Sequence, residues 1–214
     1  MTEPSTAPGA VPVHRRTMEL DAFDEGDQIL VLARLRDRRP WVDDGPGAGE
    51  VHDMELRVRV RRADLTILEC RADMHTFPHA ECPAVEAAFA GLVGRRVTRG
   101  FTKTVQSLVS GPKGCAHLDQ LARAVGPVVV QALTSSRARR LREGRVDDLL
   151  SSTPDAPWPR GTCHVWAVGG VAEQKLAAGW RPGLGPYPAP PLDAIRSGSA
   201  APSTPGTPPG SRPG

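Results

Sequence analysis

The amino-acid sequence predicts an α+β fold in which an antiparallel β-meander packs against a few helices in a single domain. Two patterns predict it. Between residues 17 and 74 apolar side chains alternate with charged ones, as in strands with one face in water. After Pro83 the apolar side chains recur every three or four residues, as on one face of a helix.

The composition of the two ends sets the boundaries of this domain. Residues 1–12 and 182–214 are rich in Pro, Gly, Ser and Thr and hold little that a core could bury. We therefore expect a disordered leader over 1–12, the domain over 13–181 and a disordered tail over 182–214.

Four strands are predicted in the first half of the chain, each bounded by turn residues. Their ranges are 17–23, 29–36, 51–61 and 65–74. A three-residue loop at 62–64 keeps the apolar side chains of the last two strands on one face and sets His52 opposite Met74. Cys70 then falls among apolar neighbours and is interpreted as a core cysteine.

Three helices are predicted next. The first follows Pro83 and ends at Gly94, the second covers 101–109, and the third begins near Cys115. The third ends in a run of arginines over 137–145. Cations complement the dipole at that end of a helix, so we interpret the run as a solvated helix end and rank nucleic-acid binding last.

The last ordered part of the chain is predicted to be a strand over 162–168 with a turn at Gly169-Gly170. The final element is expected to end near Trp180.

The composition excludes several classes of protein. No apolar run is long enough to span a bilayer, and residues 1–12 lack the basic start and apolar core of a signal peptide, which predicts a cytoplasmic protein. Aromatic residues make up 4% of the chain, which argues against a base-stacking surface. In a reducing compartment the four cysteines are expected as free thiols or metal ligands.

Thiol and imidazole groups recur at close spacing in several segments. Thiolate and neutral imidazole are preferred ligands of zinc and also suit iron. A thiol in the first turn of a helix, as predicted for Cys115, also meets the positive end of the helix dipole, which favours the thiolate. The candidate metal ligands are Cys82, Cys115, His117, Cys163 and His164, and the candidate catalytic residues are His52, Asp53, Cys115 and His117.

The same segments resemble the bacterial family catalogued as domain of unknown function 2889. The resemblance is carried, between residues 15 and 175, by His52-Asp53-Met54, Cys82-Pro83, Gly114-Cys115-Ala116-His117-Leu118 and Cys163-His164. The family typically shows Gly-Cys-Thr-His-Leu, so Ala116 departs from it at one position. The resemblance implies that His52, Asp53, the three cysteines of these segments, His117 and His164 form one set, and that His14, Cys70 and His75 lie outside it.

Three functions fit these candidates, and the reaction stays undefined. The first is a metal-dependent enzyme, with zinc or iron, that acts on a small organic acid or an acyl thioester such as acyl-CoA. The second is an accessory or binding protein whose Cys/His cluster is a structural metal site. The third is a metal-free enzyme in which Cys115 is the nucleophile and His117, His52 or His164 is its base.

His52 itself has two interpretations. It is either a buried, hydrogen-bonded histidine with Asp53 turned outward, or a metal ligand or general base that Asp53 orients.

Overall fold

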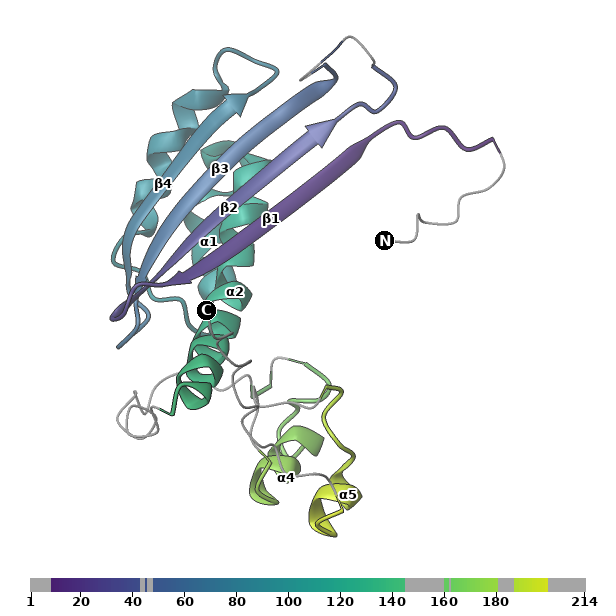
Figure 1. Ribbon diagram of the computed structural model, residues 1–214. Coiled ribbons are helices and arrows are strands. Elements are labelled where there is room, and N and C mark those ends of the chain that lie inside the picture. The colour runs from purple at the N-terminus through teal and green to yellow at the C-terminus, as the bar shows by residue number, and fades with distance from the viewer. Residues whose placement is uncertain are drawn as a thin grey trace, which may run out of the picture. The chain divides into compact units, whose positions relative to one another are not determined.

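The computed structural model describes residues 9–42, 45, 48–144, 160–161, 163–180 and 187–199. It contains a four-stranded antiparallel sheet and several helices, which confirms the predicted α+β class (Figure 1). The chain divides into two compact units, residues 1–61 with 65–129 and residues 62–64 with 130–214, and each is described by itself. The predicted leader and tail fall largely outside the described residues.

The sheet of the first unit contains the four predicted strands in the order β1-β2-β3-β4. Their bounds are β1 (Arg15–Asp24), β2 (Gln28–Arg38), β3 (Glu50–Arg61) and β4 (Ile67–Thr76). Side chains alternate between a buried apolar face and a charged outer face, most clearly on β2 and β3. This alternation is what the sequence pattern requires of strands with one wet face.

The strand registers place three polar residues side by side on the apolar face. The β1–β2 pairing is unbroken and sets Arg16 opposite Asp37. The β2–β3 pairing sets the same Asp37 opposite His52. Directly opposite residues share a face in an antiparallel pair, so Arg16, Asp37 and His52 form one cross-strand row.

The predicted register of the last hairpin was wrong by two residues along most of its length. Met74 faces Met54, and His52 has Asp37 as its neighbour in β2. The β3–β4 pairing carries irregularities next to Asp53 and next to Val60, and β4 starts at Ile67, two residues later than expected. Each irregularity adds a residue to one strand, which a loop-length argument does not detect.

The helices of the first unit cover the apolar face of the sheet, behind the strands in Figure 1. They are η1 (Cys82–Leu92), α1 (Phe101–Val109), η2 (Gly111–Lys113) and the part of α2 (Ala116–Arg142) that ends at residue 129. The first predicted helix is present as a 3-10 helix, and α1 and α2 begin within a residue of the predicted starts. The core between helices and sheet includes the fully buried Phe89, Leu92, Val105, Leu118 and Leu121.

The second unit contains α4 (Val171–Ala177) and α5 (Leu192–Arg196). The strand predicted over 162–168 was wrong, because residues 163–168 form bends and turns. The backbone folds back on itself there, with the Gly161 amide 2.6 Å from the Trp166 carbonyl oxygen. The turn at Gly169 is confirmed by a positive φ of 71°. Helix α5 lies within the range that was expected to be a disordered tail.

Within the described residues, none of the helices combines the length and the apolar composition needed to cross a membrane.

Candidate functional site

A buried carboxylate, Asp37, is the centre of the candidate site. Only 1% of its surface is exposed. Arg16 donates to both of its oxygens, from Nε to Oδ1 at 2.7 Å and from Nη2 to Oδ2 at 2.6 Å. His52 Nδ1 lies 2.9 Å from Oδ2, and His14 Nε2 lies 3.1 Å from Oδ1. Because both of its oxygens have hydrogen-bond partners, the carboxylate can be buried on the apolar face of the sheet.

The N-terminus of α2 adds a thiol and a further imidazole to this row. His117 Nε2 lies 3.4 Å from Asp37 Oδ2, and the His117 and His52 rings lie with their centroids 3.9 Å apart. Cys115 Sγ lies 3.6 Å from His117 Nδ1 and 3.7 Å from Met54 Sδ on β3. The two ring nitrogens of His117 therefore have different neighbours: Nε2 is close to the Asp37 carboxylate and Nδ1 is close to the Cys115 thiol.

Gly114 explains why the chain can enter α2 at this point. A Cβ built on Gly114 would lie 1.9 Å from the carbonyl oxygen of Val109, closer than any real contact. Only glycine permits this approach of the two backbones. The next residue, Cys115, already accepts the first helical hydrogen bond, from the Asp119 amide at 2.8 Å. Gly114 thus fixes where Cys115 and His117 stand relative to the sheet.

The electrostatics of the cluster favour an ionised carboxylate beside neutral imidazole. Burial by itself would raise the pKa of Asp37, but the hydrogen bonds from Arg16 and His52 outweigh it and lower the pKa to about 2. The pKa of His117 lies below its usual value, because burial and then the nearby His52 and Arg16 disfavour the protonated ring, against the opposing pull of Asp37. A neutral imidazole can bind a metal ion or accept a proton.

Three of these side chains satisfy the geometry of a metal site. One ligand atom from each of Asp37, His52 and His117 can be chosen so that all three lie within 4.8 Å of one another. Two imidazoles and one carboxylate are a ligand set of zinc enzymes and of non-haem iron enzymes. Arg16 would then hold the ligating carboxylate from behind, as hydrogen-bonding partners commonly do at metal sites.

The structure brings together some of the sequence-predicted residues and separates others. His52, Cys115 and His117 meet at Asp37. Asp53 is on the opposite face of the sheet, where it is buried and its Oδ1 accepts a 2.7 Å hydrogen bond from Arg34 Nε, so it does not orient His52. Asp53 is therefore turned outward, as one of the two interpretations required.

The remaining predicted ligands are Cys82, Cys163 and His164. Cys82 begins η1 and is partly buried. Among the described residues, it is not in the group whose ligand atoms converge at Asp37. Cys163 and His164 belong to the second unit, in the turns before α4, and both are exposed. Among the described residues, Asp37, His52 and His117 are a group with ligand geometry, and of the five predicted ligands this group contains His117.

Sequence reasoning did not select Asp37 or Arg16, and His14, which the resemblance placed outside the predicted set, contacts Asp37. A signal was available in the first hairpin. Its strands were predicted over 17–23 and 29–36, and counting outward from the turn between them along both strands brings Arg16 opposite Asp37. A carboxylate at an inward position of an apolar strand then demands partners.

Cys70 and His75, which were expected to play no part, behave as predicted. Cys70 is 7% exposed, and burial raises the pKa of its thiol to about 12. His75 is exposed, with Nε2 3.4 Å from Glu55 Oε2.

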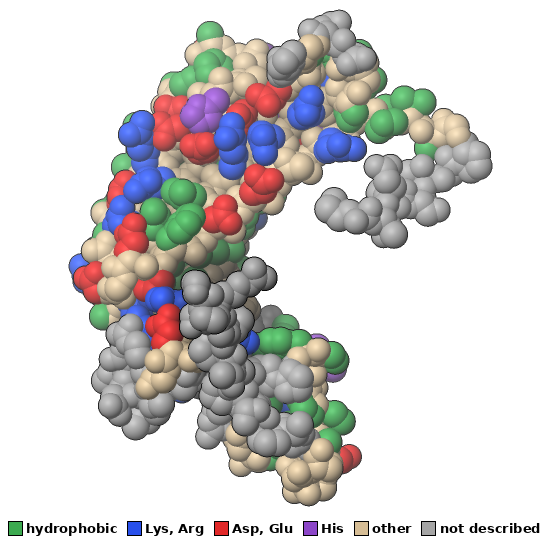
Figure 2. Space-filling view, viewed as in Figure 1, with side chains coloured by type: hydrophobic (Ala, Val, Ile, Leu, Met, Phe, Trp, Pro, Cys, Tyr) green, Lys and Arg blue, Asp and Glu red, His purple; other side chains and the backbone are tan. Residues whose placement is uncertain are grey.

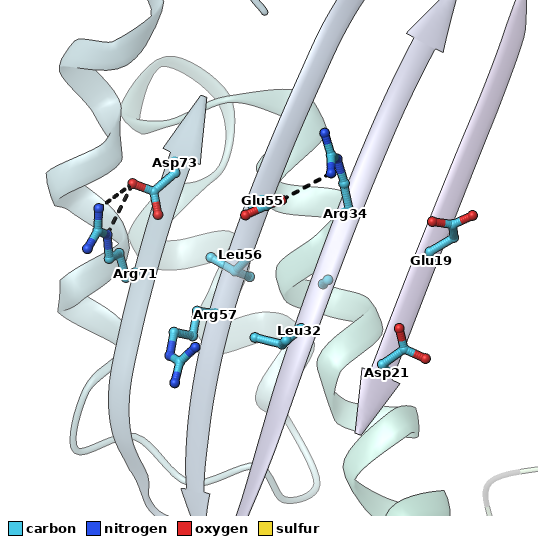
Figure 3. A pocket seen from close by; sticks show the side chains of 10 residues that line it. Glu19, Asp21, Leu32, Arg34, Glu55, Leu56, Arg57, Arg71 and Asp73 are labelled. Atoms are coloured by element: carbon cyan, nitrogen blue, oxygen red, sulfur yellow. Dashed lines mark hydrogen bonds and ion pairs between the residues drawn. The ribbon is translucent and has the colours of Figure 1, made fainter. Parts of the chain in front are cut away.

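The outer face of the sheet carries a separate, charged hollow of about 430 Å³. Figure 2 shows side chains of both signs gathered there, and Figure 3 shows that they come from all four strands. Its arginines are paired with acids, Arg34 with Glu55 at 3.4 Å and Arg71 with Asp73 at 2.8 Å. We interpret this face as the solvated side of the sheet, because exposed ion pairs of this kind are common and weak.

Fold and site together define an α+β protein with a carboxylate–imidazole cluster beneath the first turn of a helix. The chain belongs to the family described as protein of unknown function (DUF2889), whose model matches residues 14–131. The match contains Asp37, His52, Cys115 and His117 and ends before Cys163 and His164. No curated protein and no solved structure matches the chain.

Proposed function

We propose that this protein is a metal-dependent enzyme that holds zinc or iron on Asp37, His52 and His117. The observation that carries the proposal is the convergence of three ligand atoms within 4.8 Å from β2, β3 and α2. Three protein ligands leave coordination positions open, which is the arrangement of catalytic metal sites and not of closed structural ones. This favours an enzyme over an accessory protein with a structural ion.

The proposed substrate is a small organic acid or its acyl thioester. Both present a carbonyl or carboxylate oxygen that an open coordination position can polarise, or that metal-activated water can attack. His14, with half of its side chain exposed, and the partly exposed Arg16 place cationic or proton-donating groups at the rim of the site. Such a rim suits an anionic substrate.

We propose a cytoplasmic location. All four cysteines are free thiols, which suits a reducing compartment.

Metal binding is expected to depend on both histidines. Full-length protein stripped with chelator and titrated with Zn²⁺, or with Fe²⁺ under nitrogen, is expected to bind one equivalent. His52→Gln and His117→Gln should each weaken binding at least about tenfold, because each removes a ligand. Calorimetry measures the affinity, and circular dichroism verifies that each variant is folded.

His75→Gln is the matched control, since His75 is a histidine of the same sheet outside the cluster and should leave the affinity unchanged. Equal binding by all three variants, or no binding by the wild type, would contradict the proposal.

Turnover of short acyl-CoA thioesters by the metal-loaded wild type, and its loss in His52→Gln, would test the substrate class.

A second candidate is a metal-free thiol enzyme, and the contact between Cys115 and His117 favours it. In this alternative Cys115 Sγ attacks a thioester carbonyl while its proton passes to His117 Nδ1, 3.6 Å away. The bond from the carbonyl carbon to the leaving sulfur breaks, and that sulfur takes the proton from His117. Asp37, on the far side of the ring, stabilises the imidazolium that forms in between.

The thiol candidate predicts that His117 controls the alkylation of Cys115. At pH 7 the rate at which iodoacetamide modifies Cys115, followed by mass spectrometry of each cysteine, should fall at least about tenfold in His117→Gln. The exposed Cys163 provides the internal reference, and its rate should not change. Equal Cys115 rates in wild type and variant would eliminate His117 as the base.

A further inference from the structure

One edge of the sheet is partly covered and the other is open. Beyond β4, residues 94–97 bond back to the start of that strand, with the Ile67 amide 2.8 Å from the Arg95 carbonyl oxygen. Strand β1 forms the other edge (Figure 1). Among the described residues no strand or bridge pairs with its outward side, and eight of its ten residues are exposed. An open edge is a template for another strand.

Strand β1 lacks several of the features that usually block such an edge. It contains neither proline nor lysine, and its ten residues pair with β2 without a bulge. The side chains of Met18 and Phe23 are 38% and 48% exposed, one on each face of the strand. A long, regular edge with apolar side chains is suited to pairing through its main chain.

The charges along β1 indicate which strand would pair with it. Its positive residues, Arg15 and Arg16, stand at its start, and its acids, Glu19, Asp21 and Asp24, lie from its middle to its end. An identical strand in antiparallel orientation brings the positive start against the acidic end, whereas a parallel one brings like charges together. The strand is therefore complementary to itself in one orientation only.

From these observations we infer that β1 pairs with β1 of a second copy of this chain, antiparallel and about a two-fold axis at Leu20. Residues that are directly opposite each other in an antiparallel pair have their side chains on the same face of the sheet, and a two-fold axis at Leu20 meets this condition. Leu20 faces the partner's Leu20, and Met18 faces the partner's Ala22, on the side that the helices cover. Glu19 comes opposite the partner's Asp21 on the outer side, where Arg36, 3.3 Å from Glu19, offsets the repulsion. Two four-stranded sheets become one continuous sheet.

This pairing also concerns the site, because Arg16, which holds Asp37, belongs to the strand at the seam. The inference stands independently of the proposed metal, since it uses only the free edge, the side chains of β1 and their charges.

The decisive test uses two charge variants of the axis residue. Full-length wild type is expected to sediment at twice the chain mass of 22.8 kDa. Leu20→Lys and Leu20→Glu should each be monomeric, because each places like charges face to face. An equimolar mixture of the two should recover the dimer mass. Leu32→Lys, at an exposed leucine on the outer face of β2, is the control for adding a charge to the sheet and should stay dimeric.

Several outcomes would overturn the inference. A monomeric wild type would do so, as would a dimer that survives Leu20→Lys unchanged. A monomer whose β1 amides are nevertheless protected from hydrogen exchange would mean that another segment of the same chain occupies the edge. Failure of the two variants to form a mixed dimer while both remain folded would exclude the two-fold axis at Leu20.

Discussion

Gly114→Ala is expected to lower the free energy of unfolding by about 3 kcal/mol, the upper part of the range for overpacked sites. The added methyl would start 1.9 Å from the Val109 carbonyl oxygen, and both partners are backbone that cannot rotate away. The start of α2 must therefore move from the end of α1. Urea denaturation measures the loss. Because Cys115 and His117 follow directly, we also expect weaker Zn²⁺ binding by any protein that still folds.

Gly91→Ala is the matched control for this substitution. A Cβ at Gly91 meets nothing within 4 Å, and its φ is not positive. The same change there should be neutral or stabilise the protein by up to about 1 kcal/mol, because alanine restricts the unfolded chain. Similar losses from both variants would show that the contact at Val109 is not the cause.

Asp37→Asn is expected to destabilise the protein by about 2 kcal/mol at neutral pH and by much less in acid. The carboxylate has a pKa of about 2 in the folded protein against 3.8 as its ordinary value, and each unit corresponds to about 1.4 kcal/mol. Since the folded pKa is the lower one, the stabilisation is complete above about pH 4. It disappears as the pH falls toward 2, when Asp37 becomes protonated in both states.

The measurement is urea denaturation of wild type and Asp37→Asn between pH 2.5 and 7. The difference between them should shrink as the pH falls below about 4, because only the wild type loses the contribution of the ionised Asp37. Asp73→Asn, at a partly exposed aspartate paired with Arg71, provides the comparison and should cost less than about 1 kcal/mol. A wild-type advantage over Asp37→Asn that stays constant across this range would refute the assigned pKa.

The sheet could be predicted from the sequence because its signal is local. Alternation between apolar and charged side chains marks every strand, and a tight turn fixes the first hairpin. The predicted register of the last hairpin was wrong because register depends on more than the local sequence. Val60 pairs with Ile67, one residue beyond its predicted partner, and the irregularity next to Val60 adds a second residue, so Met54, and not His52, faces Met74. The strand predicted over 162–168 failed because a short apolar run is equally compatible with turns.

The site could be predicted only in part because it depends on residues that are distant in sequence. His52, Cys115 and His117 were found from their residue types. Asp37 was missed because a single acid at a strand end looks like a surface residue until its neighbours in β1 and β3 are known. Cys163 and His164 were selected for their chemistry alone, without any indication that the fold brings them to α2.

The cross-strand row of Arg16, Asp37 and His52 has a consequence for insertions and deletions. Because side chains alternate along a strand, gaining or losing one residue in the turn at 25–27 would move Arg16 to the other face of the sheet or demand a compensating bulge. The length of that turn therefore matters to the row as much as the identities of Arg16, Asp37 and His52 do. In redesigning this protein or comparing it with relatives, the spacing between Arg16 and Asp37 should be as informative as their identities.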